Sequence, residues 1–140
     1  MNHQLSKQSR RVWIIINYIS VTLLVFFFYF ARFLEKPIVF FIGGGLAILI
    51  AGATFYKTFV KTQLWKIVHS AKSELDERQM QVVLNALRYS YSAFAIITLL
   101  LIYGFALVDK ETINVLVAAC ILYLAHTLPA AVVGWTEKVI

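Results

Sequence analysis

His126 is the first residue whose type could support chemistry, because it is the only ionisable side chain well inside a long apolar stretch. An imidazole at membrane depth can relay protons or ligate a metal or a haem. A metal site needs about three or four ligands, and the sequence offers no Asp, Glu or second His at that depth. The alternative is a neutral imidazole that is hydrogen-bonded to a hydroxyl or carbonyl of a neighbouring helix. We therefore expect no metal and no cofactor.

Other polar residues also interrupt the apolar stretches. We expect Asn17 to form a hydrogen bond between helices. Asn85, Arg88 and Ser92 have the spacing i, i+3, i+7, which places them on one face of a helix and predicts a polar seam that faces another helix. Arg88 can instead extend to the membrane surface or bind a lipid phosphate.

The densest charge cluster, Ser73–Gln79, lies in the one long polar stretch of the chain. Ser73-x-x-Asp76 and Asp76-x-x-Gln79 are both close to a capping box, which predicts a helix that begins near Glu77. If the protein acts in water, it acts here, and the candidate partner-binding residues are Glu74, Asp76, Glu77 and Arg78.

Catalytic motifs are missing from the sequence. It has no Gly-rich phosphate loop, no Cys/His cluster, no HExxH and no Ser/His/Asp set. We therefore predict that the protein has no catalytic residues and is not an enzyme.

Long apolar blocks must position these residues. The 140 residues are 61% hydrophobic and 14% charged, whereas soluble domains carry roughly 25% charged residues. Four blocks reach the length of about 20 residues that a transmembrane helix needs. We predict one all-α domain over 1–140, an integral membrane four-helix bundle made of two antiparallel hairpins, with helices at about 12–33, 38–60, 85–108 and 112–135.

Residues 61–84 join the two predicted hairpins. Apolar residues recur there at helical spacing, first at Leu64, Val68, Ala71 and Leu75 and then at Met80, Val83, Leu84 and Leu87. The pattern predicts that the second and third helices extend into a cytoplasmic helical hairpin. In this hairpin the second helix continues to about Ala71, and the chain turns near Ser73–Asp76. The alternative places 61–73 flat on the lipid head groups.

The basic residues predict the orientation. One side of the membrane receives Lys7, Arg10, Arg11, Lys57, Lys61, Lys66, Lys72, Arg78, Arg88 and Lys138. The tight turns at 35–37 and 109–112 and their flanks give the other side only Arg32, Lys36 and Lys110. The positive-inside rule then places both termini and the middle stretch in the cytoplasm. The net charge of +6 therefore indicates the orientation of the chain in its membrane, and we expect no nucleic-acid partner.

Small residues at four-residue spacing favour close helix packing. They are Gly43, Ala47 and Ala51 on the second helix and Ala130 and Gly134 on the fourth. They serve either packing within one chain or an interface between copies.

The segment Leu75-Asp76-Glu77-Arg78-Gln79, running on through Val82, Val83 and Arg88 into a transmembrane helix, resembles a D-E-R-[EQ] signature. Uncharacterised small multi-pass membrane proteins of bacteria and archaea carry that signature between a second helix and a closing transmembrane pair. The resemblance covers this segment and the four-helix layout. It implies a small multi-pass protein of the inner (plasma) membrane of a prokaryote, and it supplies no activity and no catalytic residue.

Three functions fit these observations. The leading hypothesis is an accessory, regulatory or immunity-type membrane protein that acts by contact with a protein partner, by self-association or by contact with lipid. The second is a small transporter or channel, acting as a single chain or as an oligomer, that uses the polar seam with His126. The third is a structural subunit of a larger membrane complex.

Overall fold

The computed structural model describes residues 6–108 and 113–137, and these residues form helices and no strand. Four helices are long and apolar enough to cross a membrane, namely Lys7–Phe33, Pro37–Val60, Glu77–Val108 and Val115–Thr136. The structure thus confirms an all-helical chain with the features of a multi-pass membrane protein. The turn predicted at 109–112 lies outside the described residues.

The chain forms two compact units, one ending at Gln63 and the other starting at Leu64. Each unit contains one antiparallel pair of the long helices. The units are described separately below.

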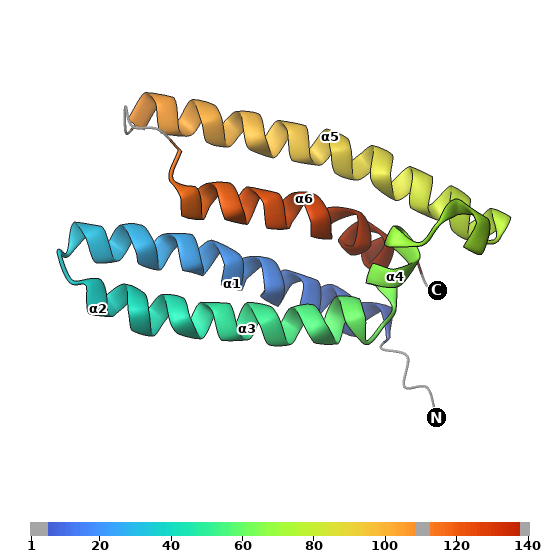
Figure 1. The fold of residues 1–140 in the computed structure, drawn as a ribbon, viewed down its shortest axis with the longest axis horizontal. Coiled ribbons are helices and arrows are strands. Elements are labelled where there is room, and N and C mark those ends of the chain that lie inside the picture. Colours follow the sequence, from blue (N-terminus) through green and yellow to red (C-terminus); the bar gives the residue numbers. More distant parts are fainter. Residues whose placement is uncertain (1–5, 109–112, 138–140) are drawn as a thin grey trace. The chain divides into compact units, whose positions relative to one another are not determined.

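The first unit is a helical hairpin (Figure 1). One arm is α1 (Lys7–Phe33), which begins after Ser6, whose hydroxyl accepts a hydrogen bond from the backbone N–H of Ser9 (3.2 Å). The other arm runs through α2 (Pro37–Val39), η1 (Phe40–Gly44), α3 (Gly45–Phe55) and η2 (Tyr56–Val60), of which η1 and η2 are π-helical turns. In the connecting turn Glu35 has a positive φ of 56°, and Pro37 takes the first helical position, where its missing N–H costs nothing.

Small residues let the two arms of this hairpin approach each other. A Cβ atom built on Gly43 would lie 2.5 Å from Cδ1 of Phe27 on α1, so only glycine leaves room for that ring. Ala47, one turn further on, is buried. The predicted small face of the second helix is therefore used, at Gly43, for packing inside the hairpin.

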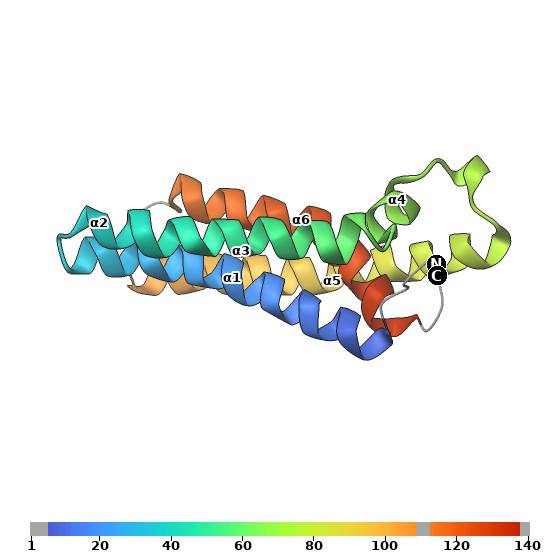
Figure 2. The ribbon, with the colours of Figure 1, turned by 90° about the horizontal axis from the view of Figure 1, so that it is seen from below.

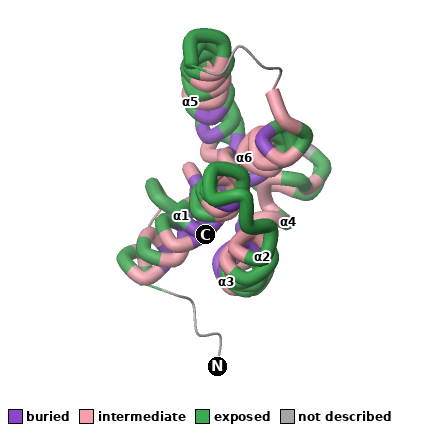
Figure 3. Tube along the Cα trace, turned by 90° about the vertical axis from the view of Figure 1, so that its left-hand side faces the viewer, coloured by how far each residue is buried: buried purple, intermediate pink, exposed green. Residues whose placement is uncertain are grey.

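The second unit contains α4 (Leu64–His69), η3 (Lys72–Glu74), α5 (Glu77–Val108) and α6 (Val115–Thr136). α5 and α6 lie side by side and antiparallel, and η3 with its flanking residues forms the loop from α4 to the start of α5 (Figures 1 and 2). α4 contacts both α6 and α5. Figure 3 shows that most of α5 is exposed or half-buried, and its buried residues are Val83, Ala86 and Ser90.

The stretch between the long helices differs from the predicted continuation of the second helix. That helix ends at Val60 rather than near Ala71. Its last turn closes through a hydrogen bond from the backbone N–H of Lys61 to the carbonyl of Tyr56 (2.9 Å). Gln63 then takes a left-handed φ of 61°, which interrupts the helix before α4 begins. The third long helix begins at Glu77, where the capping pattern places it.

Candidate partner-binding cleft

A cleft of about 170 Å³ lies in the second unit, where the start of α5 meets the end of α6 and α4. We name it the tip cleft; it is lined by Ile67, Asp76, Arg78, Gln79, Val82, Val133 and Glu137. Ile67, Val82 and Val133 supply apolar surface, and the other four residues supply polar groups. Ligand pockets usually measure about 300–1,000 Å³, so the tip cleft is sized for a single side chain rather than for a cofactor.

A reciprocal capping box fixes the side of the cleft formed by α5. Oδ1 of Asp76 accepts a hydrogen bond from the backbone N–H of Gln79 (2.7 Å), and the backbone N–H of Asp76 donates to Oε1 of Gln79 (3.3 Å). These bonds satisfy N–H groups that a helix start leaves without partners, and they place a carboxylate at the positive end of the helix dipole. The two side chains are thereby held at the cleft.

An ion pair joins the two sides of the cleft. Nη2 of Arg78 lies 3.7 Å from Oε2 of Glu137, and the Arg78 side chain is 75% exposed while that of Glu137 is 26% exposed. Glu137 is the C-cap of α6, and its backbone N–H donates to the carbonyl of Val133 (3.0 Å). A pair with one partner so exposed contributes little to stability, so an incoming charged group can displace Arg78 at small cost.

α4 forms the third side of the cleft. Its first residue, Leu64, is fully buried and anchors it. Within α4, Trp65 and His69 stack with ring centroids 4.0 Å apart, and Nδ1 of His69 lies 2.9 Å from the carbonyl of Trp65. Ile67 of the same helix lines the cleft.

The sequence-based candidates of the charge cluster separate into two groups. Asp76 and Arg78 line the tip cleft, whereas Glu74 and Glu77 are exposed and lie outside its lining. The sequence analysis missed Glu137. The signal available for it was its position directly after the last apolar block, since antiparallel helices bring the end of one beside the start of the other.

The described residues contain no group of three or more His, Cys, Asp or Glu side chains that could hold a metal ion. The tip cleft is lined by two carboxylates, a guanidinium, an amide and three apolar side chains. Such an arrangement is suited to binding a charged, partly apolar side chain.

Asn17 of α1 forms hydrogen bonds across the first hairpin. Nδ2 of Asn17 donates to the carbonyl of Ala51 (3.0 Å) and to Oγ1 of Thr54 (3.0 Å) on α3. Asn17 is fully buried, and Thr54 is 3% exposed. This is the kind of interhelical hydrogen bond that the sequence analysis expects, and it gives Asn17 a structural role.

His126 bonds within its own helix rather than to a neighbouring one. Its Nδ1 lies 2.9 Å from the carbonyl of Leu122, and the residue is exposed. Because a carbonyl can only accept, Nδ1 is the donor in this contact. The contact by itself supports neither a proton relay nor a metal site.

The predicted polar seam on α5 is exposed. Asn85, Arg88 and Ser92 all lie on its exposed surface, and the hydroxyl of Ser92 donates to the carbonyl of Arg88 (3.2 Å). On α6, Ala130 and Gly134 are both buried.

No protein-family model matches the sequence, and neither a similar curated protein nor a similar solved structure was found.

Proposed function

We propose that this chain is a non-enzymatic interaction protein of a prokaryotic cell membrane, and that it uses the tip cleft to dock a segment of a partner protein. The observation that carries the proposal is the cleft itself, a space of about 170 Å³ that is lined by four polar and three apolar side chains. The excess of basic residues around the middle stretch supports placing the cleft and both termini in the cytoplasm.

The charges favour a basic docking residue. Among the described side chains, two carboxylates and one guanidinium line the cleft, and Glu74 and Glu77 add two exposed carboxylates beside it. A Lys or Arg side chain can lay its aliphatic stem against Val82 and Val133 and bring its charge to the carboxylates of Asp76 and Glu137. To do so it must compete with Arg78 for Glu137.

This competition predicts whether each substitution tightens or weakens partner binding. Replacing Arg78 by Gln removes the competing cation and should tighten partner binding. Glu137→Gln and Asp76→Asn remove the attracting charges and should each weaken it about two- to fivefold, the effect of roughly 0.5–1 kcal/mol. Asn is as good an N-cap as Asp, so Asp76→Asn changes charge while the helix start is kept.

The experiment uses the full chain in cells with a photo-crosslinking amino acid at Val82, which lines the cleft and takes no part in the capping box. Partners crosslinked there are identified by mass spectrometry, and the same partner is then quantified for each variant. Two matched controls are available. A crosslinker at Gln81, which is exposed outside the cleft lining, should not capture the partner, and Glu77→Gln removes a neighbouring charge that does not line the cleft. Equal effects of Glu77→Gln and Glu137→Gln would rule out the cleft as the docking site.

A further inference from the structure

α5 is longer than a membrane is thick, and this length fixes the depth of Arg88. The helix has 32 residues, about 48 Å at 1.5 Å per residue, whereas a hydrocarbon core of about 30 Å takes about 20 residues. Tyr89–Val108 carries no charge and has that length. Arg88 is the charged residue next to this span, so a membrane that covers Tyr89–Val108 would put its guanidinium near the level of the lipid phosphates.

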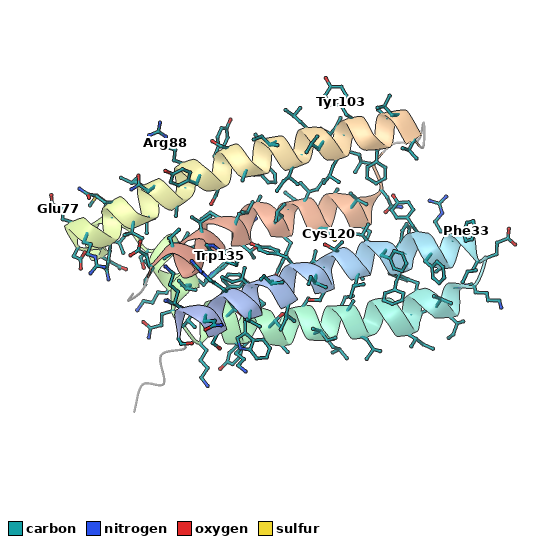
Figure 4. The ribbon with its side chains drawn as sticks, turned by 180° about the vertical axis from the view of Figure 1, so that it is seen from behind. Phe33, Glu77, Arg88, Tyr103, Cys120 and Trp135 are labelled. Carbon is teal, nitrogen blue, oxygen red and sulfur yellow. The ribbon has the colours of Figure 1, made fainter. Side chains whose placement is uncertain are left out.

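Polar side chains follow one exposed line of α5 up to that level. Gln81, Asn85 and Arg88 have the spacing i, i+4, i+7, and all three are exposed. The opposite side of the helix carries Val83 and Ala86, which are buried. Figure 4 shows the Arg88 side chain pointing away from α6. We name Gln81, Asn85 and Arg88 the headgroup stripe.

The donors of the headgroup stripe are not used inside the described structure. No hydrogen bond or ion pair joins the side chain of Asn85 or Arg88 to any other described residue. Ser92 continues the line, but its hydroxyl proton is donated to the Arg88 carbonyl, so Ser92 offers no donor. A guanidinium has five N–H donors in a planar fork that matches a phosphate group, and the neighbouring amide adds two more.

We propose that the headgroup stripe binds the phosphate of an anionic phospholipid, with Arg88 as the charged contact and Asn85 as a neutral donor one turn away. The ligand is a lipid rather than a free phosphate because the uncharged span next to Arg88 fixes the guanidinium at the depth of the lipid phosphates. The exposed rings of Tyr89 and Tyr91 fit the same interface, where amphipathic aromatic residues accumulate. This site is independent of the tip cleft.

The test is lipid retention measured by native mass spectrometry. The purified full chain in neutral detergent is titrated with phosphatidylglycerol or with phosphatidylcholine of identical acyl chains. We expect the wild type to retain phosphatidylglycerol preferentially. Arg88→Gln should lower that retention at least about tenfold, because it removes charge-assisted hydrogen bonds, while Arg88→Lys should keep part of it. Arg32→Gln changes another exposed arginine, in the last turn of α1, that also adjoins an uncharged span but has no amide side chain one turn away. It should lower retention much less than Arg88→Gln does.

Three results would overturn the proposal. Equal retention of the two lipids by the wild type would do so whether or not any variant folds. Equal loss of phosphatidylglycerol retention in Arg32→Gln and Arg88→Gln would show that retention depends only on the overall charge of the protein. Release of the bound lipid by millimolar inorganic phosphate would show that the stripe recognises phosphate without the lipid.

Discussion

Replacing Asn17 by Ala should destabilise the first hairpin by a predictable amount. The change removes two hydrogen bonds across the hairpin, to the carbonyl of Ala51 and to Oγ1 of Thr54. Hydrogen bonds between helices in a membrane protein contribute about 0.6 kcal/mol each on average and at most about 1.7 kcal/mol. We therefore expect Asn17→Ala to cost about 1–2 kcal/mol, and the coupling energy between Asn17→Ala and Thr54→Val to be about 0.6 kcal/mol.

Ser20 provides the matched control. It is 3% exposed and lies one turn from Asn17 on the same helix. Its hydroxyl donates only within α1, to the carbonyls of Ile16 and Asn17 (2.8 Å each). Ser20→Ala should therefore change stability by less than about 0.5 kcal/mol, because no bond between the helices is lost.

The assay is unfolding in a mixed micelle of mild detergent and increasing dodecyl sulfate, followed by tryptophan fluorescence. Trp13 reports on the hairpin because Nζ of Lys57, on the opposite arm, lies 3.7 Å from its ring centroid. Trp65→Phe and Trp135→Phe remove the other two tryptophans. A coupling energy below about 0.3 kcal/mol would refute the reasoning, since independent sites add to within about that margin. Equal losses for Asn17→Ala and Ser20→Ala would refute it as well.

Two further predictions each concern the substitution of one residue. Gly43→Ala should be less stable than Gly52→Ala by about 1–3 kcal/mol in the same unfolding assay. The Cβ added at Gly43 would lie 2.5 Å from the Phe27 ring, whereas nothing lies within 4 Å of a Cβ added at Gly52. Equal stabilities of the two variants would contradict the close approach of the two arms at Gly43. Asp76→Ala should cost about 1 kcal/mol and speed amide hydrogen exchange in the first turn of α5, because the bond to the Gln79 N–H is lost. Unchanged exchange would contradict the capping role, and Asp76→Asn should restore slow exchange.

The helices of this protein were predictable because the lipid solvent leaves the backbone few alternatives. Uninterrupted apolar blocks must satisfy their own backbone groups, so length and hydropathy predict four long helices. The start of α5 was equally predictable, because the capping box at Asp76 is a local pattern of four residues. Both features depend on neighbours in the sequence.

The break after Val60 and the tip cleft were not predictable in the same way. Lys61, Thr62 and Gln63 include no Gly or Pro, and the left-handed conformation of Gln63 has no signature in the sequence. The pairing of Arg78 with Glu137 depends on how α5 and α6 align, which hydropathy does not specify. The sequence analysis predicted that the polar seam on α5 faces another helix. The direction of the seam depends on tertiary packing, and in the structure its residues are exposed.

The two π-helical turns, η1 and η2, affect how this chain can change its length. In a π turn each hydrogen bond spans five residues instead of four, so the helix holds one residue more than α-helical geometry needs. Deleting one residue from Tyr56–Val60 would let that turn close as an ordinary α-helix and leave the flanking faces in place. Deleting one from α3 would instead rotate all following side chains by about 100° and turn either Ala51 or Thr54 away from Asn17. Single-residue deletions that arise during evolution are therefore best tolerated at these two turns.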